Sequence, residues 1–179
     1  MIATLLGPAA LERISGLPAE EATREAAAWL AELVVDVDFL ESEVLPQFER
    51  PHEADGPTMA VLADGGNTFA LRAFRWLVGS AAPIHDHGSW AVVSVVAGRL
   101  HEARFQRLDD GTRANDARLR RLRSYDLEPG QISILMPYAG GIHRIENRST
   151  EPAISIHLYG PNFDLGARDF DPATVDDDR

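Results

Sequence analysis

The chain has 179 residues, of which 45% are hydrophobic and 25% charged, values typical of one globular domain with a sizeable core. Its formal net charge of -11 argues against nucleic acid or an anionic membrane as a partner, because both require a basic surface. It contains no cysteine, which excludes disulfides, a thiolate nucleophile and a zinc-finger site. Residues 1–10 are apolar but lack a basic region, and no apolar run reaches the length of a membrane span, so we expect a soluble cytoplasmic protein without a signal peptide.

Helical patterns occupy residues 8–50. Pro18 suits the first turn of a helix, and the glutamates that follow suit the positive end of the helix dipole. Asp36 or Asp38 can cap a further helix, which Pro46 bends or ends. We expect these helices to pack on the outside of a sheet, with a dimer contact as the alternative. The apolar stripe that would face the sheet consists of Ala26, Leu30, Leu33 and Val34.

Short strand patterns follow a turn or linker at residues 51–57. The sequence Asp64–Asn67 is typical of a hairpin turn. Because strands and helices do not alternate, the pattern predicts an all-β barrel or sandwich after a helical preface. The expected strands lie at residues 68–76, 90–96, 99–106, 131–136, 142–147 and 153–159. We divide this single domain into a helical preface at 1–50, a barrel at 51–164 and an acidic, loosely held tail at 165–179.

Two arginines, Arg72 and Arg75, interrupt the apolar strand at 68–76. Arg72 shares one face with Phe74 and Trp76. An arginine inside a barrel can bind a carboxylate with its planar fork, whereas a strand arginine can also extend into solvent. A further basic cluster can bind an anion, but pairing with the protein's own carboxylates on a solvated strand is the expected role. That cluster consists of Arg118, Arg120, Arg121 and Arg123.

Three histidines carry the main functional signal. His85 and His87 are separated by one residue, so on an extended strand both point to one face about 6.5 Å apart. Asp86 between them points away. His143 follows a turn rich in glycine and proline. Because imidazole binds iron, copper, nickel and zinc alike, the three residues predict a metal site without identifying the metal.

These histidines are part of a longer pattern. It resembles the two sequence motifs of the cupin superfamily, whose usual glutamate after the first histidine pair is absent here. That absence, with Pro83–Gly88 and Ser155–Tyr159, resembles the thiol dioxygenases, and the cysteine dioxygenase family in particular, over residues 56–164. The resemblance implies a mainly β cupin barrel, a double-stranded β-helix or jelly roll, with N-terminal α-helices. The cupin pattern comprises His85, His87, Gly98, Gly130, Pro137, Gly140, His143 and Asn147.

The resemblance also implies an activity. Members of the family hold non-heme Fe(II) and oxidise a small thiol to its sulfinic acid with O2, and nickel or zinc can occupy the site in purified protein. Ser155, His157 and Tyr159 alternate along one strand and face the same way. In the family the matching residues form a hydrogen-bonded relay in which the tyrosine contacts substrate or oxygen. The alternative is an inner histidine that is only satisfied by hydrogen bonds.

Two positions depart from the family pattern. Val92 aligns with a cysteine that is cross-linked to the tyrosine in some members. Met59 aligns with a carboxylate-binding arginine, expected about 26 residues before the first ligand histidine. We expect Arg72, on the face that also presents Trp76, to contact an acidic substrate group instead, unless the substrate is not a simple thiol carboxylate.

Three functions therefore stay open at this stage. The first is a thiol dioxygenase, which acts as a monomer or homodimer. The second is a cupin whose diverged pocket catalyses another oxidative reaction in specialised metabolism. The third is a metal-binding or small-ligand-binding cupin without turnover.

Overall fold

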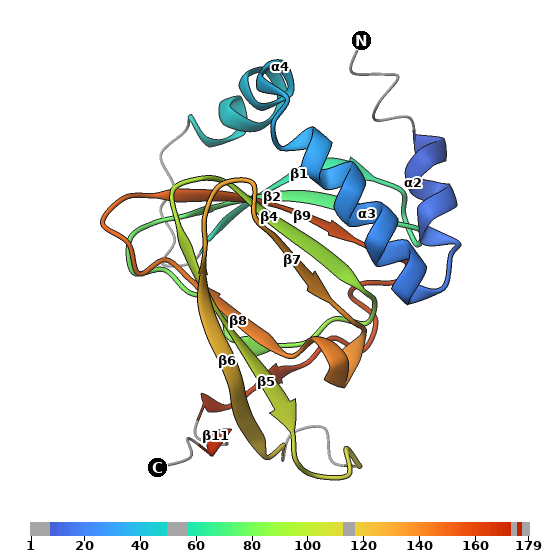
Figure 1. Ribbon diagram of the computed structural model, residues 1–179, viewed down its shortest axis with the longest axis vertical. Coiled ribbons are helices and arrows are strands. Elements are labelled where there is room, and N and C mark those ends of the chain that lie inside the picture. The colour runs from blue at the N-terminus through green and yellow to red at the C-terminus, as the bar shows by residue number, and fades with distance from the viewer. Residues whose placement is uncertain (1–7, 50–56, 113–116, 173–174, 177–179) are drawn as a thin grey trace.

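Two β-sheets lie face to face, and the N-terminal helices cover the outer face of one of them (Figure 1). This computed structural model describes residues 8–49, 57–112, 117–172 and 175–176. The linker expected at residues 51–57 lies outside these ranges except for its last residue.

The sheets interleave along the chain. Within the described residues, one sheet has five strands in the order β1-β2-β9-β4-β7 and the other has six in the order β10-β3-β8-β5-β6-β11. The chain passes between the sheets at nearly every connection after β2, as in a double-stranded β-helix, and the predicted cupin barrel with N-terminal helices is confirmed. The five strands are β1 (Thr58–Asp64), β2 (Ala70–Trp76), β9 (Ala153–Tyr159), β4 (Ala91–Ala97) and β7 (Ile132–Leu135). The six are β10 (Asp169–Phe170), β3 (Ile84–His85), β8 (His143–Glu146), β5 (Leu100–Arg107), β6 (Leu119–Leu127) and β11 (Val175–Asp176).

The helical segment follows the predicted signals. Pro18 directly precedes the longest described helix, and Asp36 caps the next helical turn by accepting from the Phe39 N–H at 3.0 Å. The last helical turns are irregular where Pro46 enters them. The helical elements are α2 (Pro8–Ser15), α3 (Ala19–Leu33), α4 (Val37–Phe39), the π-helical η1 (Leu40–Val44) and the 3-10 helices η2 (Leu45–Phe48) and η3 (Tyr138–Gly141).

The helices contribute to a core outside the five-stranded sheet. Leu30 and Phe39 are buried in one cluster with Leu71 of β2 and Leu158 of β9. Burying each such side chain stabilises the fold by about 1.5–3 kcal/mol. The predicted packing of the helices on the outside of a sheet is confirmed.

The opposite faces of the same strands line the barrel interior. Trp76 of β2, Val93 of β4 and Leu135 of β7 belong to a second apolar cluster between the sheets. The two faces of β2, β4 and β9 thus contribute to two different cores, and the interior core holds polar groups among apolar walls.

The C-terminal segment is more integrated than expected. Residues 169–170 pair with β3 as strand β10, and residues 175–176 pair with β6 as β11. Asp86, which is fully buried, accepts hydrogen bonds from the backbone N–H of Arg168 at 2.9 Å and from its Nε at 3.0 Å. The expectation of a loosely held tail is wrong for these residues, because the sequence does not reveal that Asp86 is their partner. The division into preface, barrel and tail stays a prediction.

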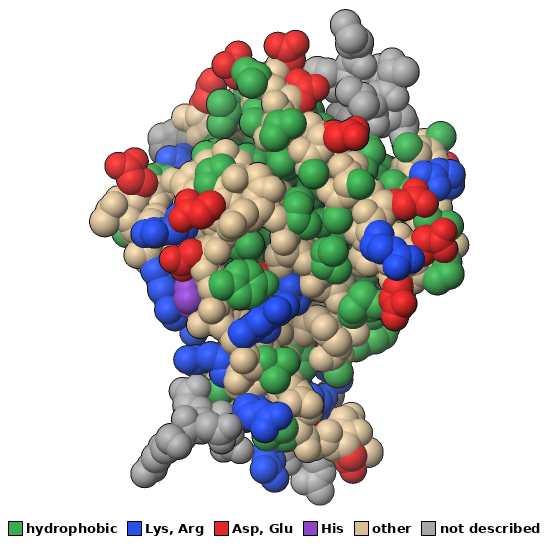
Figure 2. Space-filling model, in the orientation of Figure 1, with side chains coloured by type: hydrophobic (Ala, Val, Ile, Leu, Met, Phe, Trp, Pro, Cys, Tyr) green, Lys and Arg blue, Asp and Glu red, His purple; other side chains and the backbone are tan. Residues whose placement is uncertain are grey.

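Charged side chains are unevenly distributed over the face shown in Figure 2. Acidic residues gather over the N-terminal helices at the top, whereas arginines dominate the lower half around β5 and β6. In the predicted basic cluster, Arg120 donates to Gln106 at 2.7 Å and Arg123 lies over the Tyr125 ring. No helix among the described residues is long and apolar enough to cross a membrane.

Candidate metal centre

Three histidine side chains converge inside the barrel. His85 ends β3, His87 follows it in the loop, and His143 begins β8. One ligand nitrogen from each lies within 4.8 Å of the others. The β3–β8 register pairs His85 directly with His143, which brings together two distant parts of the sequence. The side chain of Asp86 is held by Arg168 instead, so it does not join the three imidazoles.

Hydrogen bonds made by the Nδ1 atoms of His85 and His143 indicate whether their Nε2 atoms carry a hydrogen. A backbone carbonyl only accepts, so the Nδ1 of His85, 3.0 Å from the Pro83 oxygen, carries the hydrogen. The Nδ1 of His143 likewise donates to the carboxylate of Glu102 at 2.8 Å. In the neutral form of both rings, the Nε2 atoms of His85 and His143 therefore each carry a lone pair, and the two atoms lie 3.2 Å apart. Two such lone pairs repel each other unless a cation lies between them, so the donor set fits a divalent metal.

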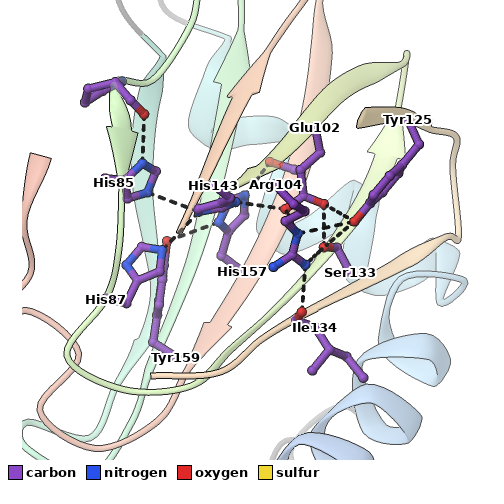
Figure 3. A network of polar contacts seen from close by, with 12 residues as sticks. His85, His87, Glu102, Arg104, Tyr125, Ser133, Ile134, His143, His157 and Tyr159 are labelled. Atoms are coloured by element: carbon purple, nitrogen blue, oxygen red, sulfur yellow. Dashed lines mark hydrogen bonds and ion pairs between the residues drawn. The ribbon is translucent and has the colours of Figure 1, made fainter. Parts of the chain in front are cut away.

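Glu102 on β5 anchors a buried network behind His143 (Figure 3). Its carboxylate is fully buried and accepts from Tyr125 at 2.7 Å and from Ser133 at 2.5 Å. Arg104 lies 3.0 Å from it through Nε and donates through Nη2 to Ser133 at 2.7 Å. Such a carboxylate–histidine pair orients a metal-binding imidazole and increases its basicity.

The buried imidazoles are neutral at physiological pH. Burial lowers the pKa of His143 to about 4 and the pKa of His157 to about 3. Burial, followed by the charges of the neighbouring histidines, lowers the pKa of His87 to about 2. Burial alone would raise the pKa of Glu102, but the hydrogen bond from His143 and the Arg104 charge outweigh it, and the pKa falls to about 2. A carboxylate and neutral imidazoles are the forms that a metal site requires.

A second hydrogen-bonded chain lies along β9. The indole N–H of Trp76 donates to Ser155 Oγ at 2.9 Å, and Ser155 Oγ lies 2.8 Å from His157 Nε2. Because Trp76 only donates, the Ser155 hydroxyl is free to donate to His157, whose Nδ1–H then donates to the Tyr159 hydroxyl at 3.1 Å. Burial raises the pKa of Tyr159, so it keeps its proton. The Tyr159 ring packs edge-on against His87, with ring centroids 5.0 Å apart. The hydrogen-bonded series from Trp76 to Tyr159 therefore ends beside the three histidines.

Arg72 lies one layer behind Tyr159. Phe163 stacks on Tyr159 with ring centroids 4.8 Å apart, and the Arg72 guanidinium lies 5.7 Å from the Phe163 centroid. The terminal nitrogens of Arg72 pair with Asp64 and donate to the Ala63 carbonyl at 2.9 Å. Arg72 is therefore buried, and its charge is matched within the protein.

A family model for cysteine dioxygenase type I matches residues 50–172. The chain belongs to this family. It is 33% identical to zebrafish (Danio rerio) cysteine dioxygenase type 1 over 123 residues, which cover 65% of this chain and 57% of that protein. It is 36% identical to the human (Homo sapiens) enzyme over 106 residues, which cover 58% of this chain and 50% of that protein. The chain thus spans about half the length of these curated relatives.

Solved structures with similar folds are more distant. A Klebsiella pneumoniae protein with a double-stranded β-helix domain matches at 19% identity and a TM-score of 0.49, over 68% of this chain and 90% of that chain. A cupin superfamily protein from Desulfitobacterium hafniense matches at 13% identity and a TM-score of 0.45, over 63% of this chain and 84% of that chain.

The structure refines both departures from the cysteine dioxygenase pattern. Val92 points away from Tyr159 into the core beneath the helices, and the β4 residue paired with Tyr159 is Ala91. The sequence alignment was therefore wrong by one residue at this position, because neighbouring strand residues face opposite ways. Met59 lies on β1 and is 53% exposed, so no buried side chain occupies the position aligned with the family's arginine.

Sequence reasoning missed the network behind His143. Glu102 and Arg104 lie two and four residues after the buried Leu100, and alternate residues of a strand share a face. Two charged side chains therefore lie on the inward face of β5. That alternation is a usable signal, since charged residues are rarely buried without partners. Their partners Tyr125 and Ser133 lie on β6 and β7, and no sequence spacing points to them.

Proposed function

We propose that this chain is a non-heme Fe(II)-dependent dioxygenase that converts a small thiol and O2 to the sulfinic acid. The reaction balances as RSH + O2 giving RSO2H, with both oxygen atoms transferred to sulfur. Membership of the cysteine dioxygenase family and the three converging ring nitrogens of the histidine site support this proposal. His85, His87 and His143 would hold the iron, which supplies the reactivity toward oxygen and favours the thiolate form of the substrate.

The three-histidine set supports an anionic ligand. The lowered pKa values keep His87 and His143 neutral, a histidine bound to a metal is a neutral ligand, and Glu102 is paired with Arg104, so these residues leave the positive charge of a divalent cation uncompensated. A thiolate compensates part of that charge, whereas a neutral ligand does not.

The remaining residues orient the reactants. In the proposed mechanism the Tyr159 hydroxyl donates a hydrogen bond to substrate or oxygen and keeps its proton. His157 and Ser155 fix the position of that hydroxyl. Arg72 and Trp76 are proposed substrate contacts, and both lie on the inward face of β2. The apolar walls of the barrel keep bulk water from the reacting atoms.

Oxygen uptake tests the proposal directly. The protein is reconstituted with Fe(II) under anaerobic conditions and exposed to O2 with cysteine, 3-mercaptopropionate, cysteamine or mercaptosuccinate. We expect one sulfinate formed per O2 consumed, and loss of the reaction in His143→Ala. Protein that holds one iron but consumes no oxygen with any thiol would contradict a thiol dioxygenase and favour another oxidative reaction or a binding function.

A further inference from the structure

A pocket of about 210 Å³ lies outside the barrel, on the outer face of the six-stranded sheet. Its walls come from β3, β5, β6 and β8 and from the C-terminal segment that contains β11 (Figure 1). Along β8 the buried His143 faces the barrel interior, whereas Arg144 and Glu146 face the other way. One strand therefore presents a candidate metal ligand to the interior and two charged side chains to this pocket.

Positive charge exceeds negative charge in the pocket. Among the lining residues that the structure describes, three are arginines, Arg121, Arg144 and Arg148, and one is a carboxylate, Glu146. Glu146 pairs with both Arg144 and Arg148, so two guanidiniums share one counter-ion. The whole chain carries a net charge of -11, so the pocket locally reverses the charge of the protein. This excess favours an anionic ligand.

Arg144 is the least satisfied of these arginines. Although 36% of its side chain is exposed, its Nε is buried, and no residue in the described part of the chain accepts a hydrogen bond from it. Its Nη2 lies 3.4 Å from Glu146, longer than the about 2.7–2.9 Å of a strong charge-assisted hydrogen bond. A buried donor without an acceptor costs free energy, which a ligand oxygen bound by this guanidinium would recover.

The floor of the pocket is apolar. Ile84, Ala103 and Phe105 line it and belong to an apolar cluster that is distinct from the core beneath the helices and from the barrel interior. A ligand that fills the pocket therefore has an apolar body beside its anionic group. The volume is smaller than the about 300–1,000 Å³ of sites for drug-sized molecules, so that body is about as large as a single ring.

We propose that this pocket binds a small phosphomonoester, with its phosphate on Arg144 and Arg148 and its organic part on the apolar floor. A phosphate offers more acceptor oxygens than a carboxylate, so it can accept from two guanidiniums at once, and the planar fork of arginine fits it in a bidentate manner. Glu146 occupies these donors only in part, because it serves both arginines. The site is separate from the metal centre and does not depend on the proposed function.

A titration with phenyl phosphate at constant ionic strength tests the site. The NMR signals of the Ile84, Ala103 and Val175 methyl groups, which line the pocket, should shift with one dissociation constant. Inorganic phosphate should bind about tenfold more weakly, because it leaves the apolar floor uncovered. Phenol, which lacks the phosphate, should leave the signals unchanged. Unmoved methyl signals with phenyl phosphate would overturn the proposal.

The metal centre serves as an internal control. No ligand histidine lines the pocket, so metal-free and Zn(II)-loaded protein should bind phenyl phosphate with equal affinity. Binding that requires zinc would place the phosphate on the metal and would also overturn the proposal.

Substitutions identify the residues that bind the phosphate. Arg144→Gln should weaken binding by about 10- to 100-fold, the range for a hydrogen bond to a charged group. Arg148→Gln, at a side chain that is 59% exposed and so unimportant for folding, should weaken it in the same direction. Glu146→Gln should tighten binding, because both arginines lose the carboxylate that competes with the ligand.

The matched control is Arg13→Gln on the N-terminal helices. This substitution also removes an exposed guanidinium that is paired with one carboxylate, that of Glu25, but it lies outside the pocket. The affinity for phenyl phosphate should stay within about twofold of the wild type. Equal weakening in Arg13→Gln and Arg144→Gln would show a general attraction of anions to surface arginines, and the pocket would then not be a phosphate site.

Discussion

Glu102 is the residue on which the orientation of His143 depends. Its carboxylate holds the Nδ1–H of His143 and is itself fixed by three side chains. We expect Glu102→Gln to weaken metal affinity by about 10- to 100-fold, because the amide is a poorer acceptor and the imidazole loses orientation and basicity. The measurement is a competition titration with a chelator of known affinity.

The matched control for Glu102 is Glu146→Gln. Glu146 belongs to the same sheet but pairs with Arg144 and Arg148 rather than with a ligand histidine. It should leave the metal affinity within about twofold. An unchanged affinity in Glu102→Gln would remove the carboxylate from any role at the metal.

Trp76 offers a second test at the residue scale. Its N–H orders the Ser155 hydroxyl toward His157, so Trp76→Phe should lower kcat by about tenfold or more while metal occupancy stays constant. The substrate contact proposed for Trp76 would instead raise KM. Steady-state oxygen uptake separates the two, and Trp90→Phe, which removes another buried indole outside this chain of hydrogen bonds, controls for packing. A drop of equal size in both variants would assign the effect to packing.

At the scale of elements, the Asp86–Arg168 pair attaches β10 to β3 beside the ligand histidines. Asp86→Asn leaves the Arg168 guanidinium without its counter-ion and should destabilise the fold by about 3 kcal/mol. Hydrogen exchange should show faster opening of residues 168–170 in this variant. Asp169→Asn, which changes an exposed carboxylate next to them, is the control. Equal protection of these amides in Asp86→Asn and wild type would contradict this attachment.

The elements also show how far the sequence could predict the structure. Six of the strands, the hairpin turn at residues 64–67 and the helix signal at Pro18 depend on neighbouring residues, so local rules could find them. The strands β1, β3 and β6 were not among the expected strands. The three histidines could be predicted because they belong to the two sequence motifs of the cupin superfamily. The partners of Glu102 could not, because they follow from the β5–β6 and β5–β8 registers. The same holds for β10, whose pairing depends on one buried carboxylate far away in the sequence.

At the scale of the whole molecule, the buried histidines make stability depend on pH. The pKa of His143 is lowered to about 4 and that of His157 to about 3, while the unfolded chain binds protons below about 6.5. Between pH 6.5 and about 4 the unfolded state therefore holds more protons, and the free energy of unfolding falls as the pH falls. Each of these histidines contributes about 1.4 kcal/mol per pH unit to this slope.

Chemical denaturation of the metal-free protein at pH 7.5, 6.0 and 5.0 measures that slope. His87, whose pKa is lowered to about 2, adds to the same slope. His157→Gln removes one of these groups without removing a proposed metal ligand, so the slope should decrease by about 1.4 kcal/mol per unit. Added metal should steepen the wild-type dependence, because it binds only the neutral imidazoles of the folded state. A free energy of unfolding that stays constant from pH 7.5 to 5.0 would mean that the native interior accepts these protons, and that the histidines are not held neutral for a metal.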